Sequence, residues 1–222
     1  MKFEDLIRTG LLLLLFVSGI GTAGEKTSSI VFTGTGTAVV VNQHSNSVSY
    51  LNLSDLVEKV EEVSVGLSPQ TAAYDAERQL IWITNQGENS VSILSSTIPK
   101  HLGFVKTKAA PYGVIISEKF AFISSQHSNL IQVFDKYNYV LIAEIEVDDK
   151  PRGMALTSDG KWLYASHFDS GKISKIDAQL FKVTETISLG SRAGLTQSIS
   201  IDENEKFAYV PNTIRNTDNT SL

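Results

Sequence analysis

The chain has 222 residues, of which 42% are hydrophobic, and it carries a net charge of −5 at pH 7. This composition suits a packed core, and the lack of a basic surplus argues against nucleic acid as a partner. The absence of cysteine excludes disulfides, thiolate nucleophiles, cysteine-ligated zinc and covalent c-type haem attachment within this chain.

The first 23 residues have the pattern of a secretory signal peptide. Lys2 and Arg8 form a basic start, residues 10–20 form an apolar run, and Gly21 and Ala23 are small residues suited to cleavage. The alternative is a membrane anchor, but the run is shorter than the roughly 20 residues that a spanning helix needs. We therefore expect cleavage, export to the periplasm or the extracellular space, and no stable membrane span afterwards.

From residue 30 onward, one pattern of strands returns several times. An apolar strand, a polar turn and an alternating strand occur at 39–51, 82–94, 122–134 and 163–176, and a fifth copy begins at residue 208. Aligned on Asn42, Asn85, Ser125 and Ser166, the fourth copy carries one extra turn residue. The copies recur about every 40 to 45 residues, which is typical of the four-stranded blades of a β-propeller.

Each copy is expected to supply four antiparallel strands. In the fourth copy these are an inner strand at 153–157, a second at 162–166, a third at 172–177 and an outer strand at 183–189. Asp159-Gly160 suits the first hairpin turn because glycine accepts a positive φ. The Gly-rich stretch 33–38 is interpreted as the equivalent hairpin rather than a phosphate-binding loop. The stretch 54–63 has some helical periodicity, but its place in the repeat favours an outer strand.

Three segments resemble the YVTN-type β-propeller repeat, a relative of the WD40 repeat: "LIWITNQGENSVSIL", "KPRGMALTSDGKWLYAS" and "TETISLG". The resemblance covers about residues 30–222 and implies an all-β fold of four-stranded antiparallel blades. The blades are expected at about 30–66, 67–108, 109–149 and 150–190, with a partial blade at 191–222. The resemblance says little about function, because propellers carry many unrelated sites.

The repeat also bears on the length of the protein. The last copy stops after its second strand, which leaves no strand to close a ring of blades and remove its sheet edges. We therefore expect about four to five blades and an N-terminal fragment of a longer protein. The alternative is a small propeller closed by oligomerisation or by an unusual C-terminal strand.

Candidate ligand-binding residues lie in the loops that open on one face of a propeller, near its axis. The loops between blades carry Gln70, Tyr112, Arg152, Arg192 and Gln197. In four of these loops a small residue follows shortly afterwards, where the chain enters an inner strand. We expect a binding surface for a ligand on these axial-face loops.

Two of these loops carry arginine, which suits an anionic ligand. Arg152 and Arg192 come from successive blades and are able to clamp a carboxylate or a phosphate. The alternative for Arg152 is a salt bridge to Asp148 or Asp149. Tyr112 either stacks on a flat ligand or caps the channel, and capping is favoured.

The turns after the second strands form a secondary surface that carries His44, His127, His167 and Arg215. Equivalent turns of adjacent blades lie on the order of 10 Å apart, whereas zinc needs ligands at about 2.1 Å. We therefore interpret the histidines as solvated turn residues and expect no metal site. The acidic residues in turns of the opposite face are interpreted as solvent-facing turn formers. These are Asp75, Glu77, Asp159, Asp202 and Glu203.

The catalytic motifs of serine hydrolases, zinc proteases and nucleotide-binding enzymes are absent. The favoured function is an exported scaffold that binds a protein, a glycan or a small molecule on its axial face. The resemblance leaves open the propeller domain of a periplasmic redox enzyme, haem d1-like or cytochrome c-linked, with any haem held by a module outside this chain. A lactonase- or lyase-like enzyme is least favoured, because the axial mouth carries Gln, Tyr, Arg and Gln instead of metal ligands.

Overall fold

The structure is a computed structural model that describes residues 27–34, 36–54, 58–190 and 195–213. For residues 27, 28, 212 and 213 only the backbone is described. The predicted signal peptide, Arg192 and Arg215 lie outside the described residues. Within the described ranges, no helix is long and apolar enough to cross a membrane.

Four four-stranded antiparallel sheets follow one another along the described chain. Sheet 1 contains β1 (Thr27–Thr33), β2 (Thr37–Asn42), β3 (Ser47–Asn52) and β4 (Glu58–Ser64). Sheet 2 contains β5 (Pro69–Asp75), β6 (Leu80–Asn85), β7 (Ser90–Ser95) and β8 (Lys100–Lys106). Sheet 3 contains β9 (Pro111–Ile116), β10 (Phe120–Ser125), β11 (Leu130–Asp135) and β12 (Leu141–Glu146). Sheet 4 contains β13 (Pro151–Leu156), β14 (Trp162–His167), β15 (Lys172–Asp177) and β16 (Lys182–Ser188).

Two shorter strand pairs follow the fourth sheet. Strand β17 (Leu195–Thr196) pairs with β20 (Asn212–Thr213), and β18 (Ser200–Ile201) pairs with β19 (Ala208–Tyr209). They occupy the first two strand positions of a further repeat. A short 3-10 helix, η1 (Gln126–Ser128), lies in the turn between β10 and β11.

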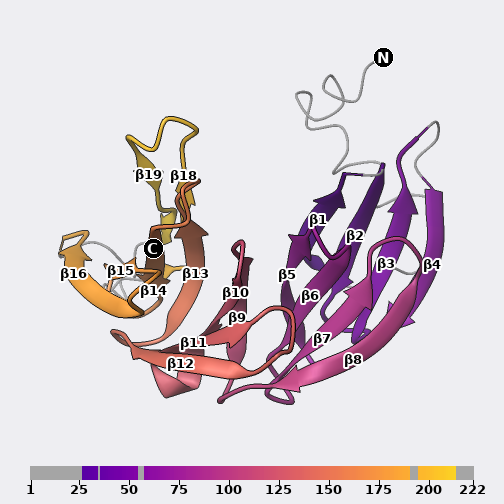
Figure 1. Cartoon of the computed structure of the whole chain (residues 1–222), viewed down its shortest axis with the longest axis horizontal. Helices are drawn as coiled ribbons and strands as arrows, with labels where there is room; N and C mark the ends of the chain where they lie inside the picture. Colours follow the sequence, from indigo (N-terminus) through magenta and orange to yellow (C-terminus); the bar gives the residue numbers. More distant parts are fainter. Residues whose placement is uncertain (1–26, 35, 55–57, 191–194, 214–222) are drawn as a thin grey trace, which may run out of the picture.

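The sheets lie side by side along an arc, with β1, β5, β9 and β13 on its inner side and β4, β8, β12 and β16 on its outer side (Figure 1). The outer strands expose most of their residues, and the others are partly or fully buried. This is the alternation expected of strands that expose one face to solvent. The stretch 54–63, for which a helix was the alternative, contributes residues 58–63 to strand β4, as the repeat predicts.

The hydrophobic cores lie between neighbouring sheets. Trp82 of β6 is fully buried between sheets 2 and 3, and Phe122 of β10 is fully buried between sheets 3 and 4. On β6, Ile81 and Ile83 face sheet 1 while Trp82 faces sheet 3. The second strands are therefore buried on both faces, which explains continuous apolar runs such as "LIWIT".

The fourth copy of the repeat has a different register from the one that the sequence predicts. Strand β14 ends at His167, and four turn residues separate it from β15, as four residues separate β6 from β7. The predicted extra turn residue is therefore wrong. His167, rather than Ser166, occupies the position of Asn42, Asn85 and Ser125 at the end of the second strand.

Candidate functional site

One face of the arc carries the loops between sheets and the turns that follow the second strands, and we call it the axial face. Its backbone repeats from sheet to sheet. Asn46, Asn89 and Asn129 each end a turn with a positive φ between 53° and 56°. Their Oδ1 atoms accept the backbone N–H groups of Ser68, Ala110 and Lys150, at 2.8 to 3.1 Å. Each turn is therefore tied to the next between-sheet loop.

A second repeated contact holds the inner-strand backbone at Tyr112 and Arg152, two of the candidate ligand-binding residues. The hydroxyl of Thr84 donates to the carbonyl of Tyr112, and the hydroxyl of Ser124 donates to the carbonyl of Arg152, both at 2.7 Å. A Cβ on Gly113 would collide with that same carbonyl of Arg152. The predicted small residue at this position is thus required by the close approach of two inner strands.

Arg152 and Tyr112, both predicted as site residues, lie together with two residues that the sequence did not single out. The guanidinium carbon of Arg152 lies 3.3 Å from the ring centre of Phe168 and 4.9 Å from that of Tyr112. Its Nε donates to Oε1 of Gln126 at 2.7 Å. Tyr112 lies on β9 and Gln126 in the turn after β10, whereas Arg152 lies on β13 and Phe168 in the turn after β14. We call these four residues the Arg152 cluster.

The alternative assignment for Arg152, a salt bridge to Asp148, is wrong. Asp148 accepts a charged hydrogen bond from Lys172 at 2.6 Å, which holds the pKa of its carboxyl below the usual range. Among the described residues, Arg152 forms no ion pair with Asp149 or any other carboxylate. Burial lowers the pKa of Arg152, while the nearby charge of Asp169 opposes this effect. Asp169 itself pairs with Lys150.

The other predicted site residues are not gathered at the Arg152 cluster. Gln70 is buried and donates to Oε1 of Gln86 at 3.0 Å, a contact within sheet 2. Gln197 is exposed at the beginning of the further repeat. Gln70 thus supports a turn, whereas Gln197 remains available on the surface.

The predicted solvation of the turn histidines holds for His44 and His127, which are exposed, and is wrong for His167. His167 is fully buried, and its Nε2 lies 2.8 Å from Oγ of Ser174. Burial lowers the pKa of this imidazole. The cause is the register of sheet 4, which makes His167 the last residue of a strand that is packed on both sides.

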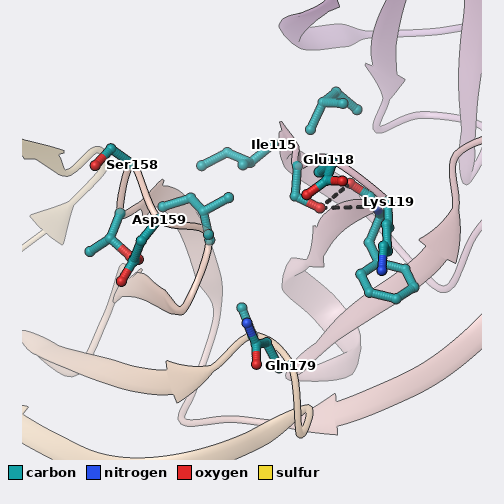
Figure 2. Close-up of a pocket in the computed structure, with 13 residues that line it drawn as sticks. Ile115, Glu118, Lys119, Ser158, Asp159 and Gln179 are labelled. Carbon is teal, nitrogen blue, oxygen red and sulfur yellow. Dashed lines mark hydrogen bonds between the residues drawn. The ribbon is translucent and has the colours of Figure 1, made fainter. Parts of the chain in front are cut away.

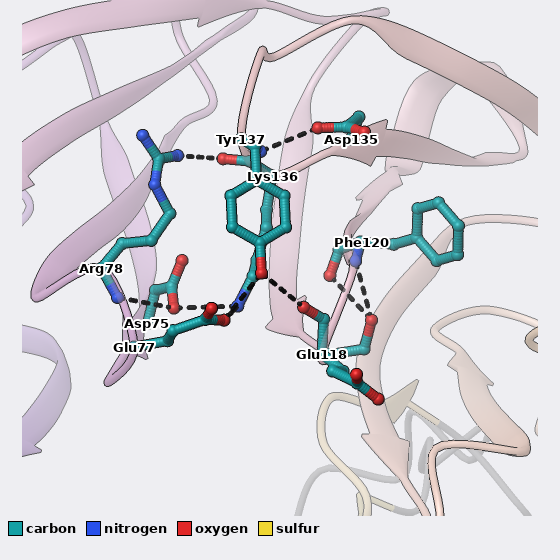
Figure 3. A network of polar contacts seen from close by, with 9 residues as sticks. Asp75, Glu77, Arg78, Glu118, Phe120, Asp135, Lys136 and Tyr137 are labelled. Carbon is teal, nitrogen blue, oxygen red and sulfur yellow. Dashed lines mark hydrogen bonds and ion pairs between the residues drawn. The ribbon is translucent and has the colours of Figure 1, made fainter.

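The interpretation of Asp75 as solvent-facing is also wrong. Asp75 is 1% exposed, and its Oδ1 lies 3.1 Å from Nζ of Lys136 in the turn between β11 and β12 (Figure 3). The same Nζ lies 2.9 Å from Glu77, whose carboxylate also accepts the hydroxyl of Tyr137. Arg78 donates to the carbonyl of Lys136. These residues join sheets 2 and 3 on the opposite face.

The opposite face also holds a groove of about 780 Å³ between sheets 3 and 4. Its lining includes apolar Ile115 and Leu156, near the ends of inner strands β9 and β13. Figure 2 shows Glu118 and Lys119 on one side of the groove and Ser158 and Asp159 on the other. Asp159 accepts hydrogen bonds from the Thr157 hydroxyl and from the Lys161 backbone N–H. These bonds, the first more than the second, lower the pKa of its carboxyl. The groove is therefore charged at its rim.

Phe168 was missed because the register of sheet 4 was misaligned, and Gln126, in the third blade, was not singled out. Both directly follow the last residue of a second strand, as do Gln43 and Gln86. With His167 aligned to Asn85, Phe168 becomes the aromatic exception in a column of glutamines. That exception is the sequence signal that would have found it.

Comparison with solved structures identifies the fold. Hydrazine synthase from Kuenenia stuttgartiensis matches with a TM-score of 0.81 and 20% identity over 90% of this chain and 60% of that chain. The chain has a β-propeller fold. Virginiamycin B lyase from Staphylococcus aureus matches this propeller with a TM-score of 0.72 and 15% identity, over 86% of this chain and 64% of the lyase chain. A streptogramin B lyase matches with a TM-score of 0.73 and 16% identity, over 87% and 64% of the respective chains.

The propeller described here spans about three fifths to two thirds of those solved chains, so it is a partial propeller relative to them. No model of a known protein family and no curated protein matches the sequence. The prediction of an all-β propeller with four-stranded antiparallel blades is confirmed, and each sheet is one blade. Among the described residues, no three histidine, aspartate or glutamate side chains are grouped so as to hold a metal ion.

Proposed function

We propose that this chain is an exported, YVTN-type β-propeller that acts as a scaffold and binds a ligand through its axial face. One observation carries the proposal. Successive blades hold the axial-face backbone in the same way, through the Asn46, Asn89 and Asn129 contacts, while the side chains that this backbone presents differ. A fixed backbone with variable side chains is what a binding surface requires. The Arg152 cluster, built from two blades, is its chemically most distinctive part.

Export and the nature of the ligand belong to the same proposal. Export rests on the signal-peptide pattern of residues 1–23. The ligand is a small molecule, or an exposed segment of a protein or glycan, that reaches the loops around Tyr112 and Gln197. Tyr112 is half-buried and Gln197 is exposed, so both are accessible from solvent.

A library of small molecules and glycans, screened by thermal shift, tests the proposal. A true ligand should raise the Tm of the wild-type chain and of the opposite-face control Lys119→Ala/Gln179→Ala, which alters two exposed residues of the other face. It should raise the Tm of Tyr112→Ala/Gln197→Ala much less. A ligand that stabilises this axial-face variant as strongly as the wild type would contradict the proposal.

A second candidate function is the propeller domain of an enzyme whose catalytic residues or haem lie outside this chain. Its support is the fold-level likeness to proteins named as a synthase and as lyases. Mass spectrometry of each stabilising compound after incubation separates the two functions. Unchanged compound favours the scaffold, whereas conversion to a product favours the enzyme.

A further inference from the structure

Among the described residues, no carboxylate forms an ion pair with the positively charged Arg152 side chain. Its Nε is taken by Gln126, but no hydrogen bond or ion pair between described residues involves its two Nη atoms. The side chain is half-buried, and its Nη atoms keep some exposure to solvent. The Nη edge is therefore accessible and has no hydrogen-bond or ion-pair partner among the described residues.

The guanidinium is also held in a fixed orientation. The centre of the Phe168 ring lies 3.3 Å from the guanidinium carbon and that of the Tyr112 ring 4.9 Å, so two aromatic rings pack against the guanidinium. Gln126, which holds Nε, is 94% buried and cannot easily rotate away. What remains for a ligand is the in-plane edge with its parallel N–H groups. That edge matches an anion with two coplanar oxygens.

Charge near the site selects among such anions. Removing a cation from water without a partner is unfavourable, so a bound anion would compensate Arg152. The negative charge of Asp169 acts on Arg152, and although Lys150 pairs with Asp169, that charge disfavours a dianion. A phosphate carries up to two charges near neutral pH, whereas a carboxylate carries one. The aromatic rings beside the edge also suit a ligand with an apolar body next to its charged group.

We propose that Arg152 is the anion subsite of the axial face and binds a carboxylate group of the ligand. This inference rests on the proposed function, since it names the chemical class that the axial face recognises. Gln126 is a positioning residue in it, and Tyr112 and Phe168 orient the guanidinium by stacking.

Calorimetric titration with sodium benzoate, inorganic phosphate and neutral benzamide tests the assignment. Benzoate should bind the wild-type chain and the opposite-face control Lys119→Gln with a Kd of about 1 mM or tighter, and benzamide and phosphate should bind more weakly. Arg152→Gln should weaken benzoate binding by about 10-fold or more, since it removes a charge-assisted bond. Arg152→Lys should bind benzoate with an affinity between those of the wild type and Arg152→Gln, because an ammonium neither stacks nor binds in bidentate fashion.

A readout on the wild-type chain does not depend on whether the Arg152 variants fold. The Nε–H resonance of Arg152, assigned by comparison with Gln126→Glu, should shift in NMR spectra on addition of benzoate. Equal affinity of the wild type and Arg152→Gln would show adventitious anion binding and overturn the assignment. Tighter binding of phosphate than of benzoate would overturn the carboxylate class.

The remaining outcomes separate this inference from the proposed function. If no anion binds while neutral library compounds depend on Tyr112, the anion subsite is wrong and the scaffold stands. If no anion binds and no compound depends on the axial face, both are wrong.

Discussion

His167 stands where the first two blades have asparagine. Asn42 donates to Ser49 and Asn85 donates to Ser92, both at 2.9 Å, and His167 makes the equivalent contact to Ser174. The amide carries no charge at any pH, whereas the imidazole becomes a cation in acid. Because burial lowers the pKa of His167, the fourth blade contains a buried group that resists protonation.

This residue should make stability depend on pH. The unfolded chain protonates His167 near its ordinary pKa of about 6.5, while the folded chain does so only at lower pH. The contribution of His167 to stability is therefore fully present above about pH 6.5 and is lost as the pH falls toward the lowered pKa of His167. His167→Asn, which introduces the residue of the first two blades, should reduce the pH dependence of the free energy of unfolding between pH 7 and 5, measured with urea. His127→Asn, at an exposed turn, should leave the slope unchanged, and an equal slope in all three proteins would refute the assignment.

Asn89 shows how single residues keep the axial-face loops in shape. It has a φ of 56°, and its side chain accepts the N–H of Ala110 at 2.9 Å. In the fourth blade Gly171 takes this place with a φ of 61°. Asn89→Ala should cost about 2 kcal/mol in unfolding free energy, from the positive φ and the lost hydrogen bond together. Asn89→Gly should cost less, and the reverse order would show that the backbone conformation is not the cause.

At the scale of elements, Lys136 is the cation that joins the second and third blades. Its side chain is 3% exposed and lies between Asp75 and Glu77. Burial lowers the pKa of Lys136, but the hydrogen bonds to Glu77 and Asp75 together raise it above the ordinary value. Lys136→Met should destabilise the chain by about 3–5 kcal/mol, because Asp75 is left as a buried, unpaired carboxylate. Urea unfolding monitored by circular dichroism measures this change.

The double variant Asp75→Asn/Lys136→Met is the matched control for that experiment. It removes both buried charges, so it should be clearly more stable than Lys136→Met alone. A double variant that is no better than the single one would mean that the loss comes from packing of the lysine stem rather than from its charge.

The repeat explains why the blades could be predicted from sequence. Strand and turn signals recur in each copy, so an ambiguous segment such as β4 could be assigned from its place in the repeat. The Asp159-Gly160 turn was predicted from its own residues, and Gly160 has a φ of 68°. Contacts without a counterpart in other blades were missed. Asp75 and Lys136 are 61 residues apart, and their pairing follows from how two blades meet rather than from any local pattern. The Arg152 cluster was found in part, through Tyr112 and Arg152.

At the scale of the whole molecule, the arc separates two faces with different chemistry. The axial face holds the repeated asparagine contacts and the Arg152 cluster, while the opposite face holds the Lys136 network and the groove between blades 3 and 4 (Figures 2 and 3). Because hydrophobic cores lie between neighbouring blades, the position of each between-blade loop depends on both of the blades that it joins. A ligand held by two blades should therefore also stabilise the interface between them.

Hydrogen–deuterium exchange, read by mass spectrometry with and without a ligand from the thermal-shift screen, tests the central claim most directly. The account predicts slower exchange in the axial-face segments 109–113, 126–129, 150–153 and 168–171, with little change in the turns 117–119, 157–160 and 178–180. Protection concentrated in those opposite-face turns would contradict it and would place ligand binding in the groove instead.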